Sequence, residues 1–363
     1  MPPRATSSEA GVPPIPSAPL ARPARAELQR DESLDIAKGF GIILVVLGHC
    51  LDGLVDSRFF PAGVLWLVLA IYVIYTFHMP LFFVVSGHLA SGKHRPASTT
   101  IARLVPSIVY PYFLWSILQD LVQIYLSKSN HFPITSLYKI LWIPPVPYWF
   151  LYSLFFCHVG YLAIRNLAPR MQLLIAIVAF TLPIFFIQQL SQAYLQIVLD
   201  TVRGFLYFVL GALTVAQVKR FGRGTAITTT LFFVIAATVF HLSGLGGAAG
   251  TVAVVPVALS GIAATLAWSR LLTAHPGRLV SKLVYGLAFL GRYSMSIYVM
   301  HIFFTAGVRI GLKHLAIHPA LLTTIIEVTA ATVLGTLAPL AINWILSKWN
   351  LDKWFGIQHM EVA

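Results

Sequence analysis

Two ionisable side chains, Lys38 and His49, stand in the first apolar segment of the chain, and the ten residues between them are apolar or glycine. In a helix this spacing is about three turns and about 16 Å, so both side chains share one face, with Asp35 close to the same stripe. An ionisable group inside a membrane costs several kcal/mol unless it is paired or hydrated. A neutral imidazole at His49 suits a general base or a nucleophile. We therefore predict Asp35, Lys38 and His49 as catalytic, against the alternatives of a membrane-edge anchor and a packing histidine.

The second apolar segment carries a histidine beside a proline, His78 and Pro80, and ends near Ser86. Proline frees backbone carbonyls, and a membrane tolerates this only against protein or a hydrated cavity. A kinked helix with a packing histidine is the structural alternative. A second imidazole in the adjacent segment favours a functional role over packing, so we predict His78 as catalytic. Ser86, near the cytosolic face, is predicted to bind substrate.

Basic residues follow that segment and recur near the C-terminus. Lys93, Arg95 and Arg103 lie in one loop region, and Arg292 precedes a later apolar run. Guanidinium groups match phosphate oxygens. We predict that these four residues bind an anionic cytosolic ligand, with membrane topology and lipid headgroups as the alternative.

Aromatic and hydroxyl side chains mark two more segments. Tyr148 and Trp149 open one, where they suit an interfacial belt or the stacking of a sugar ring. Ser294, Tyr298 and His301 follow the i, i+4, i+7 spacing of one helical stripe. All five are predicted to bind substrate.

The elements that position these residues are long apolar segments. Hydrophobic residues make up 58% of the 363 residues and charged residues 10%, with a mean hydropathy of +0.80. Soluble domains have about 45–50% apolar residues and about 25% charged residues, so this composition excludes an ordinary soluble enzyme. We predict an all-α, polytopic transmembrane helical bundle of about ten spans, because each span needs about 20 residues. The predicted spans are 36–55, 64–90, 104–126, 148–164, 171–188, 203–218, 225–242, 250–270, 284–309 and 320–347.

Charge fixes the predicted orientation. Ten spans place roughly three times as many Lys and Arg residues on the side of the N-terminus as on the other, which predicts that both termini are cytosolic. The net charge of +13 therefore suits a membrane surface and an anionic ligand better than nucleic acid. The proline-rich residues 1–33 are predicted to be a disordered cytosolic tail, 34–350 the membrane domain, and 351–363 a short cytosolic tail.

Four motifs in order resemble the acyltransferase 3 family, particularly its fucose 4-O-acetylase-type members. They are Asp35-Ile-Ala-Lys38-Gly with His49, Phe77-His78-Met-Pro80 through Ser86-Gly87, Tyr148-Trp149-Phe150-Leu151, and Gly291-Arg292-Tyr293-Ser294 through His301. The resemblance implies a multi-pass enzyme of the bacterial inner membrane. Such an enzyme moves an acetyl group from cytosolic acetyl-CoA to a sugar hydroxyl of a cell-surface or lipid-linked glycan. It implies a glycan acceptor and membrane lipid as partners, with no metal and no nucleic acid.

The family's basic-residue-x10-His pair falls on Lys38 and His49, although many members have arginine at the first position. The glutamate that follows Trp-Phe-Leu in many relatives is absent here, where Tyr152-Ser153-Leu154 stands. Ten spans with kinked helices and buried histidines also suit a proton-coupled transporter or exporter, which is the alternative function.

Overall fold

A computed structural model describes residues 31–56, 65–91, 95–126, 134–187, 193–274, 278–314 and 321–360 of the chain, and their regular structure is helical throughout. Short π and 3-10 segments cover Val105–Val109, Ile134–Leu141 and Asp352–Phe355. The α-helices are α1 Glu32–Asp56, α2 Leu65–Ser91, α3 Ala97–Leu104, α4 Tyr110–Leu126, α5 Trp149–Ile164, α6 Pro169–Ile187, α7 Ala193–Leu213, α8 Val215–Val218, α9 Arg223–Ser243, α10 Gly247–Ala274, α11 Arg278–Arg292, α12 Ser294–His314 and α13 Leu321–Lys348.

Eight spans within the described residues are long and apolar enough to cross a membrane. Two shorter apolar helices, Trp149–Ile164 and Pro169–Ile184, fall where the fourth and fifth spans are predicted. The prediction of an all-α transmembrane bundle is thereby confirmed. The cytosolic location of both termini stays a prediction, and the predicted tail lies outside the described residues up to residue 30.

Two predicted spans differ from single straight helices. The span predicted at 284–309 consists of two helices, α11 and α12, which meet at Tyr293. The span predicted at 104–126 begins earlier, with α3 at Ala97, and widens into a π turn over Val105–Val109. Pro106 lies in that turn and lacks the N–H that an α-helical ladder requires, which accounts for the irregularity.

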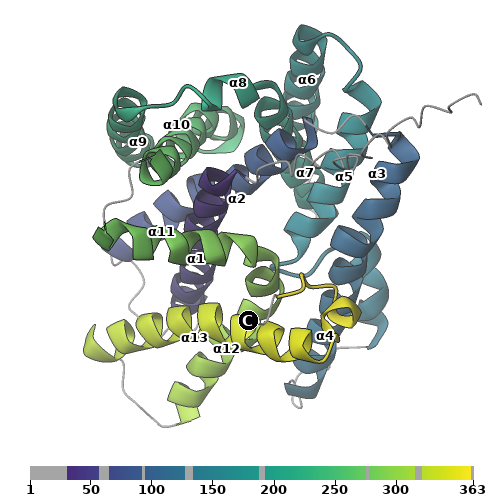
Figure 1. Cartoon of the computed structure of the whole chain (residues 1–363), viewed down its shortest axis with the longest axis vertical. Helices are drawn as coiled ribbons and strands as arrows, with labels where there is room; N and C mark the ends of the chain where they lie inside the picture. Colours follow the sequence, from purple (N-terminus) through teal and green to yellow (C-terminus); the bar gives the residue numbers. More distant parts are fainter. Residues whose placement is uncertain are drawn as a thin grey trace, which may run out of the picture. The chain divides into compact units, whose positions relative to one another are not determined.

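Glycines let α1 and α11 approach to backbone contact. α1 packs on α2, α10, α11, α12 and α13, and in Figure 1 it lies behind the crossing helix α11. A Cβ atom at Gly39 would lie 1.9 Å from the Leu287 carbonyl oxygen, and one at Gly291 would lie 1.7 Å from that of Asp35. Such approach strengthens van der Waals packing where the hydrophobic effect gives helices no preference for each other over lipid.

The residues after α13 pack onto the bundle. The Trp115 indole N–H of α4 donates to the Phe355 carbonyl at 2.9 Å, and Asn343 of α13 donates to the Gln358 carbonyl at 3.1 Å. Ile357 is 6% exposed. This segment, expected as a tail, therefore links the end of α13 to α4.

Candidate active site

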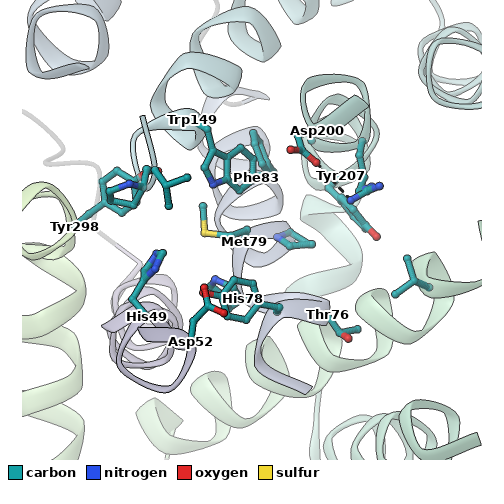
Figure 2. A pocket seen from close by; sticks show the side chains of 17 residues that line it. His49, Asp52, Thr76, His78, Met79, Phe83, Trp149, Asp200, Tyr207 and Tyr298 are labelled. Atoms are coloured by element: carbon teal, nitrogen blue, oxygen red, sulfur yellow. Dashed lines mark hydrogen bonds and ion pairs between the residues drawn. The ribbon is translucent and has the colours of Figure 1, made fainter. Parts of the chain in front are cut away.

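A cavity of about 480 Å³ lies among α1, α2, α5, α7, α10 and α12. Figure 2 shows His49 of α1, His78 of α2, Trp149 of α5 and Tyr298 of α12 around this space. We call it the imidazole cavity. Four residues singled out in separate sequence segments thus line one site.

Pro80 stands inside α2 where this helix lines the imidazole cavity. Proline has no N–H to donate, so it leaves the Thr76 carbonyl without its usual helical hydrogen bond. Thr76 and Pro80 both line the cavity. His78 lies between them, and its Nδ1 is 2.7 Å from the Ile74 carbonyl oxygen. A carbonyl accepts only, so Nδ1 carries the proton and Nε2 carries the lone pair of the neutral ring.

His49 has two aromatic or imidazole ring neighbours, one on α2 and one on α12. Its ring centre is 5.2 Å from that of His301 and 6.2 Å from that of Tyr75. The Tyr75 ring is in turn 5.0 Å from the His78 ring. The structure therefore places His49 in direct ring contact with His301 and links it to His78 through Tyr75.

The three residues of the predicted Ser294–Tyr298–His301 stripe occupy different positions relative to the imidazole cavity. Tyr298 lines the imidazole cavity, and its hydroxyl donates to the Pro147 carbonyl. His301 is fully buried behind His49. Ser294 is the first residue of α12 and is not among the residues that line the cavity.

Tyr148 and Trp149 also separate. Trp149 lines the imidazole cavity, whereas Tyr148 is fully buried and its hydroxyl donates to the Val299 carbonyl at 2.8 Å. Adjacent residues at the start of a helix point about 100° apart, so only one of the two faces the cavity. Tyr148 instead joins α5 to α12.

A second polar face of the imidazole cavity comes from α7. Asp200 Oδ1 lies 3.5 Å from Arg203 Nη1, and both residues line the cavity together with Asp52 of α1. Figure 2 shows Asp200 across the cavity from His49. Among the described residues, no group of three His, Cys, Asp or Glu side chains is arranged to hold a metal ion.

A second cavity, of about 520 Å³, carries three arginines: Arg95, Arg103 and Arg165. We call it the arginine cavity. Its wall includes Ser86 from the last two turns of α2. Ser86, which was predicted to bind substrate, thus lines a different cavity from His49. One Arg165 guanidinium N–H donates to the Arg95 carbonyl at 2.7 Å, which joins α5 to the chain before α3.

The remaining predicted residues lie outside both cavities. Lys38 Nζ is 2.7 Å from Asp35 Oδ1, and neither residue is among those that line the two cavities. Arg292 is exposed at the end of α11 and also lines neither cavity. Lys93 lies outside the described residues.

Two basic residues of the arginine cavity, His158 and Arg165, were not predicted as site residues. His158 lies on α5 and Arg165 is the C-cap of that helix, and their separation of seven residues is the i, i+7 spacing of one helical face. That spacing was visible in the sequence. Arg165 also satisfies the charge rule for membrane topology, so its sequence position alone does not distinguish the two roles.

The fold defines a multi-pass helical membrane protein with two cavities between its helices, each lined in part by charged side chains. The chain belongs to the acyltransferase 3 family, because the family model Acyl_transf_3, described as an acyltransferase domain, matches residues 31–344.

Two curated relatives have the same name in different organisms. The chain is 33% identical over 157 residues to the nodulation protein NolL of Mesorhizobium japonicum, covering 41% of this chain and 39% of that protein. It is 48% identical over 63 residues to the nodulation protein NolL of Sinorhizobium fredii, covering 17% of this chain and 16% of that protein. The matches therefore span well under half of the relatives' length. No solved structure matches the chain significantly.

Proposed function

We propose that this acyltransferase moves an acetyl group from cytosolic acetyl-CoA to a sugar hydroxyl of a cell-surface or lipid-linked glycan, in a bacterial inner membrane. The observation that carries the proposal is the pair of cavities. One carries guanidinium groups that suit an anionic donor, and the other carries imidazoles beside polar and aromatic side chains that suit a sugar. Family membership favours this enzyme over the proton-coupled transporter.

The arginine cavity suits coenzyme A, which is a polyphosphate. Arg95, Arg103 and Arg165 come from the chain before α3, from α3 and from α5, so their guanidinium groups can surround a phosphate. Planar guanidinium forks bind phosphate oxygens in pairs. We therefore assign donor binding to these three arginines and no longer to Arg292.

The two cavities adjoin along α2 and α5. On α2, Phe83 lines the imidazole cavity and Ser86 lines the arginine cavity, less than one turn apart. The Phe83 ring meets the Phe150 ring edge to face at 4.9 Å, and Leu154, one turn beyond Phe150, lines the arginine cavity. In this proposal the thioester arm of a coenzyme A molecule held by the arginines passes the Phe83–Phe150 pair to reach the imidazole cavity.

The imidazole cavity suits a sugar acceptor. Asp52 and Asp200 offer carboxylates, which accept hydrogen bonds from the hydroxyl groups of a sugar. Arg203 adds hydrogen-bond donors. Trp149 supplies an aromatic face on which a sugar ring can stack. By the predicted orientation, the part of α1 that carries His49 and Asp52 lies toward the outer side, so acetyl transfer occurs away from the cytosol.

His49 supplies the chemistry in this proposal. As a general base it takes the proton of the acceptor hydroxyl while that oxygen attacks the thioester carbonyl. The carbon–oxygen bond forms, the carbon–sulfur bond breaks, and the proton then passes to the departing thiolate. A nucleophilic His49, which forms an acetyl-imidazole first, gives the same products. Lys38 and Asp35 hold the start of α1 through their ion pair.

The test uses membrane vesicles from cells that express the protein, with radiolabelled acetyl-CoA and a panel of methyl glycosides that includes methyl fucoside. We expect His49→Ala to abolish label transfer while the protein remains inserted in the membrane. The exposed His314 on α12 supplies the control, and His314→Ala should leave transfer at the wild-type rate. Normal transfer by His49→Ala would end the proposal.

A further inference from the structure

The buried imidazole of His301 takes no part in the proposed transfer of the acetyl group. His301 is completely buried on α12, and its Nδ1 lies 2.7 Å from the Tyr298 carbonyl oxygen and 3.2 Å from that of Ile297. Both carbonyls only accept, so Nδ1 holds the ring proton. Nε2 of the neutral ring is therefore a lone-pair acceptor.

That acceptor is unsatisfied within the described part of the chain. His301 Nε2 is buried and has no hydrogen-bond partner there. Buried polar atoms are nearly always hydrogen-bonded, and an unpaired one lowers stability. If this position served only to pack the core, we would expect either a histidine with both nitrogens hydrogen-bonded or an apolar residue. The orphaned nitrogen therefore points to a partner that forms during function.

His49 is the neighbour with a donor to offer. The two ring centres are 5.2 Å apart and the rings are tilted by 38°. Two imidazoles joined by an N–H···N bond have centres about 5 Å apart, because the bond spans about 2.9 Å and each nitrogen lies about 1.1 Å from its ring centre. A small rotation of His49 closes the bond, and catalytic hydrogen bonds often tighten only when substrate is bound.

We propose that His301 is a positioning residue, whose Nε2 accepts the hydrogen bond of the His49 N–H that faces away from the substrates. This inference rests on the proposed function of His49. The bond fixes which His49 nitrogen carries the proton, so the lone pair of the other nitrogen faces the imidazole cavity. When His49 takes the proton of the acceptor hydroxyl, both of its nitrogens are protonated and His301 stabilises the new positive charge. The proton then leaves with the thiolate, and His301 never changes its own protonation.

Two amide variants separate the two nitrogens of His301. His301→Asn keeps a donor at the position of Nδ1 and removes the acceptor at the position of Nε2. His301→Gln places an amide oxygen near Nε2. We expect His301→Asn to lower kcat about 100-fold with unchanged KM for acetyl-CoA, and His301→Gln to recover at least a tenth of the wild-type kcat. The control is Thr305→Val, one turn further along α12, whose buried hydroxyl donates to the Ile302 carbonyl of its own helix.

A second measurement reads His49 directly and needs no acceptor. Diethyl pyrocarbonate acylates the lone pair of a neutral imidazole, and mass spectrometry of the peptide that contains residue 49 gives the rate at this site. We expect a rate at least tenfold lower in His301→Asn than in wild type, and a smaller loss in His301→Gln.

Equal rates at His49 in wild type and His301→Asn overturn the inference, as does an equal loss of kcat in both amide variants. The failure of the proposed function gives a different pattern. In that case the wild-type vesicles transfer no acetyl group, while the acylation rate at His49 still responds to His301.

Discussion

A methyl group at Gly39 tests whether the close crossing of α1 and α11 holds the site in shape. The added Cβ atom would lie 1.9 Å from the Leu287 carbonyl oxygen, and ordinary contacts begin at 3.4 Å. The clash is with backbone, which cannot rotate away. The two helices must therefore separate by about 1.5 Å, since membrane helices pack backbone to backbone only at small residues.

The magnitude follows from what the two helices carry. α1 carries His49, and α11 continues at Tyr293 into α12, which carries Tyr298 and His301. Overpacking of this kind costs about 1–3 kcal/mol of stability. A shift of about 1 Å between reacting groups can cost about 100-fold in rate. We therefore expect Gly39→Ala to lower kcat by about 100-fold.

The assay is acetyl transfer in vesicles, together with thermal unfolding of the detergent-solubilised protein. Gly286→Ala is the matched control, because Gly286 lies on the same crossing helix α11 and a Cβ there meets no atom within 4 Å. Both changes raise helix propensity by about 1 kcal/mol, so any difference between them comes from the contact. Wild-type kcat and thermal stability in Gly39→Ala would refute the view that this crossing positions His49.

The remaining predictions concern the two cavities. Arg165→Leu should raise the KM for acetyl-CoA about 10- to 100-fold with little change in kcat, because one charge-assisted hydrogen bond contributes about 1.5–3 kcal/mol. Arg170 is an exposed arginine on α6, and Arg170→Leu should change neither KM nor kcat. An equal effect of the two substitutions would contradict donor binding in the arginine cavity. Asp200→Asn keeps the side-chain shape and removes the charge beside Arg203, so we expect a roughly tenfold higher KM for the methyl glycoside. The KM for acetyl-CoA should not change in that variant, and a shift in the donor KM instead would move Asp200 out of the acceptor site.

The sequence predicted the helical spans well because each span must satisfy its own backbone hydrogen bonds in lipid. That requirement is local, so a run of apolar residues predicts a helix without knowledge of its neighbours. The break at Tyr293 was not predicted, since α11 and α12 read as one apolar run. The break accompanies the crossing of α11 over α1, which depends on the contact of Gly39 with Gly291, residues far apart in the chain.

The candidate site was predicted in part for a similar reason. His49, His78, Trp149 and Tyr298 stood out as polar or amphipathic residues in apolar segments, and they line one cavity. Ser86 stood out on the same ground but lies in the other cavity. The helical spacing within α2 does not show which of its residues line one cavity and which line the other.

The sequence did not predict which side chains would make hydrogen bonds or line cavities between different helices. Tyr148 was predicted from its motif to bind substrate, yet its hydroxyl bonds to the Val299 carbonyl of α12. Arg165 was counted as a topology signal, yet it lines the arginine cavity. Both outcomes depend on which helix lies next to α5, and residue spacing along one helix carries no such information.

The central claim is that His49 moves an acetyl group to a glycan hydroxyl, and mass spectrometry of surface glycans tests it most directly. Cells that lack the gene are complemented with wild type, His49→Ala or His314→Ala, with equal amounts of protein in the membrane. We predict that wild type and His314→Ala add 42 Da, about the mass of one acetyl group in place of a hydroxyl hydrogen, and that His49→Ala adds nothing. Acetylated glycan at the wild-type level in His49→Ala cells would contradict the account.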